Sequence, residues 1–139
     1  MDLTTDAELR SILTGAQGIA LVGWSPKPDR PSHRVAAFLI ARGYRVYPVN
    51  PAAAGQRALG QVVRASLAEI EEPVDMVDIF RRSEDVGPVV TEALLRPDVR
   101  VIWMQIGVIN PTAAAEARAA GVRVVMDRCP AIEIPRLGL

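Results

Sequence analysis

The chain has 139 residues, half of them hydrophobic, and its 16 lysine and arginine side chains balance 16 aspartates and glutamates. At this length a single domain buries roughly two-thirds of its unfolded surface, so a core can form without metals or disulfides. The hydrophobic content argues against intrinsic disorder, and the zero formal net charge argues against a dedicated nucleic-acid-binding protein.

The sequence also argues against a membrane protein. Its longest uncharged stretches, residues 11–26 and 101–115, contain Gly, Pro, Asn or Gln and fall short of the roughly 20 apolar residues that span a bilayer. No basic start followed by an apolar run opens the chain, so we expect no secretory signal and a cytoplasmic location. One cysteine cannot form an internal disulfide, which fits that compartment.

Apolar runs alternate with helix-like segments, which is typical of an α/β protein with a parallel sheet. In chain order the pattern predicts a helix over 6–14, a strand over 19–23, a helix over 32–42 capped by Ser32, and a strand over 45–49. There follow a crossing loop over 50–60, a short edge strand over 61–64, and a short helix from the capping-box sequence at Ser66 to Glu69. The remaining elements are a strand over 74–80, a helix over 84–96 capped by Ser83, a strand over 99–105, a helix over 112–120 and a strand over 122–126.

The order of these strands follows from the handedness of their connections. Parallel crossovers are nearly always right-handed, so the six strands predict a single doubly wound, mainly parallel sheet of Rossmann type. The expected strand order is 3-2-1-4-5-6, in one domain covering residues 1–139. The first strand is apolar throughout and should be central.

A ligand of such a sheet binds outside the carboxyl ends of the strands, where the strand order reverses. The loop after the first strand begins at Gly23 and enters a helix, so backbone amides and the positive end of the helix dipole can hold an anion there. Lys27, Arg30 and Arg34 add positive charge. The alternative interpretation is a proline-stiffened turn with solvated charges.

The nucleotide is not expected to be NAD. The loop is neither a Walker A sequence nor Gly-x-Gly-x-x-Gly, and Val49-Asn50-Pro51 takes the place of the acidic residue that holds the NAD ribose. An apolar, amide-bearing strand end suits an adenine or a ribose that carries its own phosphate. A phosphorylated nucleotide is therefore favoured.

Five stretches resemble, in order, the stand-alone CoA-binding domain proteins, a family similar to the N-terminal CoA-binding domain of the succinyl-CoA synthetase alpha subunit. They are 19–23 with Ser25-Pro26 and Arg30-Pro31-Ser32, 47–51, 73–82, 101–105 and 126–129. The resemblance implies that the protein binds coenzyme A at the carboxyl edge of its sheet. The cofactor-binding residues that it implies are Gly23, Ser25, Arg30, Ser32 and His33 near the phosphates, Val49, Asn50 and Pro51 near the adenosine, and Phe80, Arg81, Arg82, Gln105 and Gly107 near the nucleotide or pantetheine. Lys27 and Arg34 join the cofactor-binding set through their charge, and Trp24 joins it as a core or pocket-wall residue.

Several single residues admit two interpretations. His33 is a surface or capping residue, a phosphate ligand, or a catalytic group. Cys129 is a buried inert thiol, or a reactive one whose pKa is lowered by Arg128 beside it. Arg81 and Arg82 equally suit solvated charges at a helix entry, and Asp78 is expected to hold the loop after the first strand.

The leading hypothesis is a non-catalytic or regulatory binding protein for coenzyme A or acyl-CoA, with no catalytic residue and no metal site. The alternatives are an enzyme or enzyme subunit that uses an acyl-CoA, with Cys129 or His33 contributing, and an NAD- or ADP-binding domain. No nucleic-acid or membrane partner is expected. Short sheet edges and the apolar segment 132–139 permit a homodimer without requiring one.

Overall fold

Five parallel strands form the central sheet of the protein, in the order β2-β1-β5-β6-β7. We describe residues 4–139 from a computed structural model. The strands are β1 (Gly18–Val22), β2 (Arg45–Val49), β5 (Met76–Ile79), β6 (Val101–Met104) and β7 (Arg123–Val125). The α/β, Rossmann-type, mainly parallel architecture expected from the sequence is confirmed.

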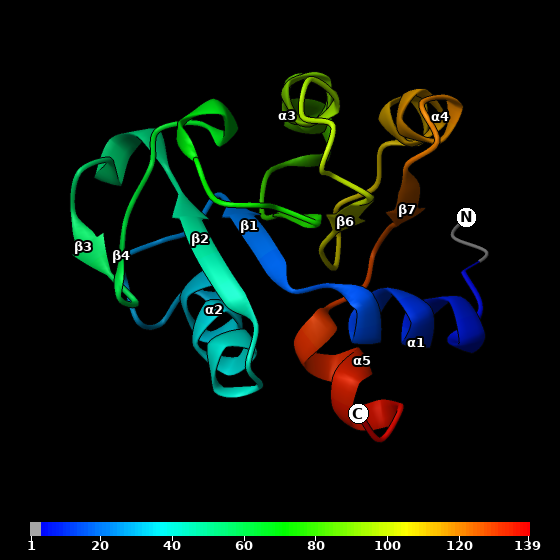
Figure 1. Ribbon diagram of the computed structural model, residues 1–139, viewed down its shortest axis with the longest axis horizontal. Coiled ribbons are helices and arrows are strands. Elements are labelled where there is room, and N and C mark those ends of the chain that lie inside the picture. The colour runs from blue at the N-terminus through cyan, green and yellow to red at the C-terminus, as the bar shows by residue number, and fades with distance from the viewer. Residues whose placement is uncertain (1–3) are drawn as a thin grey trace.

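Helices cover both faces of this sheet (Figure 1). Helices α3 (Val86–Leu94) and α4 (Pro111–Ala119) lie on one face, and α1 (Asp6–Gly15), α2 (Pro31–Ala41) and α5 (Pro130–Arg136) lie on the other. Each face has its own cluster of buried apolar side chains, so every residue of β1 is buried, as its unbroken apolar run predicts. None of the helices in this part of the chain is long and apolar enough to cross a bilayer.

The expected third strand is the main correction to the topology. Residues 61–64 do not add a ladder to the sheet; β4 (Gln61–Val62) instead pairs antiparallel with β3 (Arg57–Ala58). Leu59 and Gly60 both have positive φ, 58° and 73°, as the two-residue turn of a tight hairpin requires. Arg64 still reaches the expected edge, where it forms one parallel bridge to Val49.

Two expected N-caps are also wrong. Helix α2 begins at Pro31 with Arg30 as N-cap, and the Ser32 hydroxyl instead accepts a hydrogen bond from the Ser25 amide. The helix expected over 84–96 begins as a 3-10 turn, η3 (Ser83–Asp85). The Ser83 hydroxyl does not cap it but donates to the Gly107 carbonyl and accepts from the Ile109 amide in the loop after β6. By contrast, the capping box at Ser66 and Glu69 is present and starts the 3-10 helix η2 (Leu67–Glu69).

Two further elements were not expected. The start of the loop after β2 forms a 3-10 turn, η1 (Pro51–Ala53), with the Asn50 side chain accepting from the Ala52 amide. The apolar C-terminal segment forms α5, whose Ile134 and Leu137 are buried in the protein's own core. Most of the apolar surface that would permit a dimer is therefore covered within the chain.

Candidate functional site

The turn after β1 brings three strand ends together at Gly23. Its φ is +90°, and a Cβ at this position would lie 2.2 Å from the carbonyl oxygen of Phe80. The amides of Gly23 and Trp24 both donate to the carbonyl of Val49, at 2.9 and 3.3 Å. Only glycine fits this turn, and it holds the ends of β1, β2 and β5 close together.

The loop from Trp24 to the start of α2 is held by its own side chains. The Ser25 amide donates to the Ser32 hydroxyl over 3.0 Å, and the His33 ring nitrogen Nδ1 lies 3.0 Å from the Ser25 carbonyl oxygen. The His33 ring also stacks on Trp24, with centroids 5.5 Å apart. The side-chain Nδ2 of Asn50 donates to the Trp24 carbonyl over 2.7 Å. Five of the predicted site residues are thus connected by hydrogen bonds and ring stacking: Trp24, Ser25, Ser32, His33 and Asn50. The role of His33 in this group is structural.

The N-terminus of α2 opens at the end of this loop. Arg30 makes no side-chain hydrogen bond to the first turn, Pro31 occupies the first helical position, and no acidic residue lies in that turn. The exposed side chains of Lys27 and Arg30 have no partner among residues 4–139, while Arg34 donates to the Asp29 carbonyl. A positive helix end with unpaired cations beside it favours an anion.

A cleft of about 830 Å³ lies next to this helix start, between α2 and α5 and over the ends of β5 and β6. Its size is that of a small-molecule site. Of the predicted site residues it brings together Arg34, Phe80, Arg81, Arg82 and Gln105. The remaining lining residues are Pro31, Val35, Phe38, Ile106, Val108, Cys129, Ala131 and Ile132.

The charged groups that line the cleft all have the same sign. They are Arg34, Arg81 and Arg82, and no carboxylate is among the lining residues. Arg82 is exposed and pairs with Asp85 at 2.8 Å and Glu84 at 3.5 Å. Arg81 is half-buried and has no hydrogen-bond or ion-pair partner within residues 4–139. An anionic ligand would therefore supply the partner that Arg81 lacks.

Gln105 connects the cleft to a buried carboxyl group. Its Nε2 donates to Oδ1 of Asp78 over 2.9 Å, and Asp78 is fully buried with no partner at Oδ2. Burial raises the pKa of Asp78 to about 7, although the hydrogen bond from Gln105 lowers it in part. Asp78 thus holds the loop after β6, and the expectation that it holds the loop after β1 was wrong.

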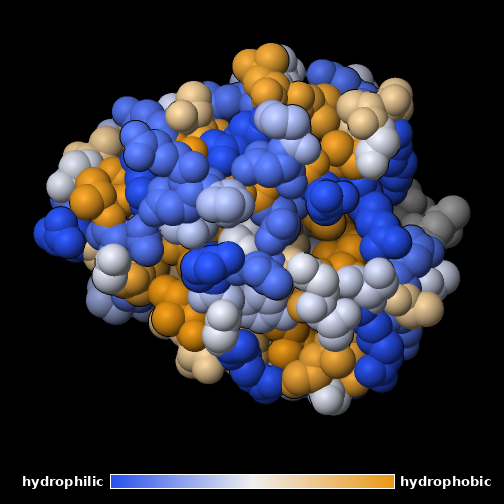
Figure 2. Space-filling model, viewed as in Figure 1, coloured by the Kyte–Doolittle hydropathy of each residue, from blue (hydrophilic) through white to orange (hydrophobic). Residues whose placement is uncertain are grey.

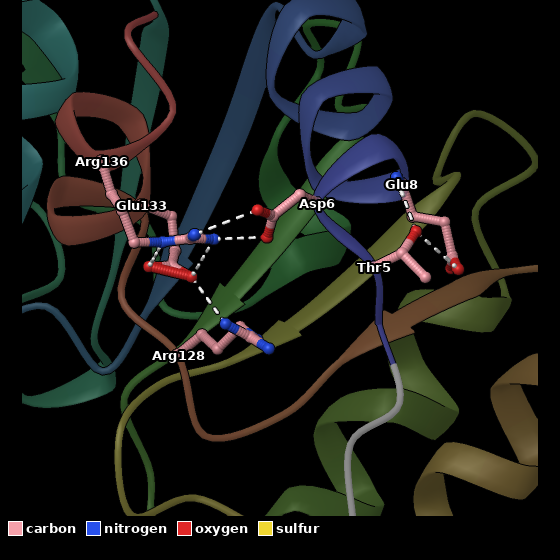
Figure 3. A network of polar contacts seen from close by, with 6 residues as sticks. All are labelled: Thr5, Asp6, Glu8, Arg128, Glu133 and Arg136. Atoms are coloured by element: carbon pink, nitrogen blue, oxygen red, sulfur yellow. Dashed lines mark hydrogen bonds and ion pairs between the residues drawn. The ribbon is translucent and has the colours of Figure 1, made fainter.

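Cys129 lines the cleft but is not an activated thiol. Burial raises its pKa, and the nearby carboxyl groups of Asp78 and Glu133 add to that effect. Arg128 does not lower this pKa, because it donates to Glu133 over 2.7 Å (Figure 3). Of the two interpretations of Cys129, the buried, unreactive thiol is the one that this geometry supports.

Gly107 lies beside the cleft, in the loop that connects β6 to α4. Its amide donates to Oδ1 of Asp127 over 2.7 Å, and its carbonyl accepts from the Ser83 hydroxyl. The loops after β5, β6 and β7 are thereby tied to one another. Between residues 4 and 139 no group of three His, Cys, Asp or Glu side chains is arranged to hold a metal ion.

Several lining residues of the cleft were not among the predicted site residues. Val35 and Phe38 lie at helical spacing on one apolar face of α2, and such a pattern does not separate a face packed on the core from one that lines a cleft. Ala131 and Ile132 belong to a helix that was not predicted, and Ile106 and Val108 carry no chemical signal of their own.

The reversal of strand order between β1 and β5, with an open helix N-terminus beside it, is the topology of a Rossmann-type domain. The profile of the family described as CoA binding domain matches residues 17–135 of the chain. The chain belongs to this CoA-binding domain family, as its sequence resemblance indicated.

Close relatives share the whole fold. An uncharacterized protein of Bacillus subtilis, YneT, is 41% identical over 129 residues, which cover 93% of each chain. A Thermus thermophilus structure, cell-free ID.343, is 40% identical with a TM-score of 0.90, and the match covers 96% of this chain and 99% of that one. A hypothetical protein from Pyrococcus horikoshii is 36% identical with a TM-score of 0.93, covering 100% of this chain and 96% of that chain.

Proposed function

We propose that the protein binds coenzyme A, free or as an acyl-CoA, as a small non-catalytic or regulatory cofactor-binding protein. The observation that carries the proposal is the uncapped N-terminus of α2, which opens between unpaired cations and a cleft with a wholly cationic set of charges. Coenzyme A carries a diphosphate and a 3′-phosphate, and arginine makes paired hydrogen bonds to such groups. Membership of the CoA-binding domain family supports the same ligand.

The residues divide by the part of the cofactor that they would meet. The backbone at Gly23 and Ser25, with Lys27 and Arg30, would hold phosphate groups at the start of α2. Asn50 and Pro51, at the end of β2, would lie toward the adenosine. The groups assigned to the nucleotide or the pantetheine are Arg81, Arg82, Gln105 and Gly107.

Binding is favoured over catalysis by the condition of the two candidate catalytic residues. The pKa of Cys129 is raised, which leaves its thiol protonated, and the His33 ring is stacked on Trp24 beside the Ser25 carbonyl. Neither group is prepared to attack a thioester or to transfer a proton.

Isothermal titration calorimetry tests the proposal directly. The protein is titrated with CoA, dephospho-CoA, ADP and NAD. We expect CoA to bind most tightly, and dephospho-CoA more weakly because one phosphate contact is lost. Absence of measurable CoA binding at high protein concentration, or equal binding of NAD and CoA, would refute the proposed function.

The unpaired arginine of the cleft gives a sharper test. Arg81→Ala should weaken CoA binding about tenfold or more, because a charge-assisted hydrogen bond contributes about 1.5–3 kcal/mol. The control is Arg100→Ala, since Arg100 is an exposed arginine just before β6, at the opposite end of the strands from the cleft. Equal affinities for the two variants would remove Arg81 from the site.

A further inference from the structure

The cleft between α2 and α5 is more apolar than coenzyme A alone requires. Its walls are formed by Val35 and Phe38 on α2, Ala131 and Ile132 on α5, and Val108 after β6. The pantetheine arm of coenzyme A contains two amide groups, and each loses free energy if it is buried without a hydrogen-bond partner. A wall of this kind suits a hydrocarbon better than an amide.

Apart from its three arginines, the cleft offers a ligand few polar side chains. Gln105 is the only uncharged amide or hydroxyl side chain among the lining residues, and its Nε2 is already bound to Asp78. Nothing in residues 4–139 donates to its Oε1, so Gln105 can accept one hydrogen bond from a ligand amide. The lining residues on α2 and α5 include no uncharged amide or hydroxyl side chain.

The mouth of the cleft carries large apolar side chains in contact with solvent. Ile106 is 59% exposed and Ile132 is 55% exposed, and both line the cleft. Figure 2 shows apolar residues at the surface in the region of α2 and α5. Exposed isoleucines around a concave site indicate a ligand that covers them.

The charges at the same cleft restrict what that ligand is. Arg34, Arg81 and Arg82 lie among the apolar lining residues and no carboxylate does. The arrangement is complementary to a molecule with an apolar end and a phosphorylated end. A neutral lipid would leave Arg81 without a partner, and a free nucleotide would leave the isoleucines exposed.

We propose that this cleft holds the straight apolar acyl chain of an acyl-CoA thioester, and this inference rests on the proposed function. The cofactor's phosphates would lie at the start of α2 and the acyl chain between Val35, Phe38 and Ile132. Each methylene that enters the cleft should raise the affinity up to about threefold to fourfold, until the cleft is full. An acyl chain that ends in a carboxylate should gain less than an apolar chain of the same length, because its charge loses hydration between Val35, Phe38 and Ile132.

A chain-length series tests the inference by calorimetry on the whole protein. The ligands are CoA, butyryl-CoA, hexanoyl-CoA, octanoyl-CoA and succinyl-CoA. Affinity should rise from CoA through butyryl-CoA to hexanoyl-CoA or octanoyl-CoA, and succinyl-CoA should bind less tightly than butyryl-CoA, whose acyl chain has the same length. CoA binding without any dependence on chain length overturns this inference and leaves the proposed function standing, whereas no binding of any ligand overturns both.

A pair of matched variants locates the chain. Ile132→Asp places a charge at an already exposed position of the cleft and should abolish the increase in affinity with chain length. Leu95→Asp makes the same change at an 80% exposed position at the end of α3, on the opposite face of the sheet, and should retain the increase. An increase that survives in Ile132→Asp, or a dimer by light scattering that this substitution dissociates, would show that the cleft is not the acyl site.

Discussion

Position 23 accepts glycine alone, because a side chain there meets the backbone of the neighbouring strand. Gly23→Ala should destabilise the protein by about 2 kcal/mol or more, since both the positive φ and the contact with the Phe80 carbonyl are unfavourable. Gly43 is the control: its φ is +96° but nothing lies within 4 Å of an added Cβ, so Gly43→Ala should cost only about 1 kcal/mol. Urea denaturation measures both. Equal losses would mean that the contact with Phe80 relaxes without cost.

The buried carboxyl group of Asp78 makes stability depend on pH. Its pKa is 3.8 when unperturbed and about 7 in the folded protein, a difference that corresponds to about 4 kcal/mol. Between these values the unfolded chain releases the proton and the folded protein keeps it. The stabilising contribution of the protonated group is therefore complete below pH 4 and is lost as the pH rises through 7.

The substitution Asp78→Asn removes this titration. The free energy of unfolding of the variant, relative to the unsubstituted protein, should increase from pH 4.5 to about pH 7 and then level off, because above pH 7 Asp78 is ionised in both states. Groups such as Asp98, whose pKa is lowered chiefly through Arg96 against the opposing effect of burial, are the same in both proteins and cancel in the difference. Urea denaturation at five pH values gives this difference. A constant difference across the range would contradict the raised pKa.

At the scale of the elements, helix α5 is attached to the rest of the fold by a charged network (Figure 3). Glu133 is buried and accepts hydrogen bonds from Arg128 and Arg136, and Arg136 also pairs with Asp6 of α1. Glu133→Ala leaves partly buried arginines without this carboxylate and should cost about 2–3 kcal/mol. Glu116→Ala, at an exposed position of α4, should change stability by less than about 0.5 kcal/mol. Similar thermal shifts in the two variants would show that the network contributes little.

The elements that could be predicted from the sequence are those with a strong local signal. The strands predicted over 19–23 and 99–105 rest on uninterrupted apolar runs, and the structure forms β1 and β6 there, with every residue of both strands buried. Pro130 suits the first position of helix α5, but Pro135 lies inside the helix, where local propensity is unfavourable. The helix is stabilised by its packing and by Glu133. The β3–β4 hairpin turns at Leu59-Gly60, which lacks the asparagine or aspartate that usually marks such a turn.

At the scale of the whole molecule, one sheet separates two apolar clusters, and neither cluster is complete without it. Unfolding should therefore be a single cooperative transition. Tryptophan fluorescence reports the cluster on the side of α1, α2 and α5, because Trp24 and Trp103 both lie there. Far-ultraviolet circular dichroism reports the helices of both faces. The two signals should give superimposable urea curves. Leu39→Ala on one face and Val90→Ala on the other should shift both signals together, and separate midpoints would show that the faces unfold independently.

The position of the candidate site could be predicted at the level of the sheet, because the topology of parallel strands places their carboxyl ends at one edge. Arg34, Phe80, Arg81, Arg82 and Gln105 were predicted site residues and line one cleft. The walls contributed by Ala131 and Ile132 could not be predicted. Their part in the cleft depends on how α5 packs beside α2, which is a tertiary arrangement without a local pattern.

The loop between β1 and α2 has one more consequence, for chemistry at the bench. Lys27 is the only lysine of the sequence, and its side chain is exposed beside the open end of α2. An amine-selective reagent therefore has a single side-chain target in the whole chain. The rate at which that one amine reacts, with and without a ligand, makes Lys27 a natural footprinting probe for occupancy of the phosphate loop.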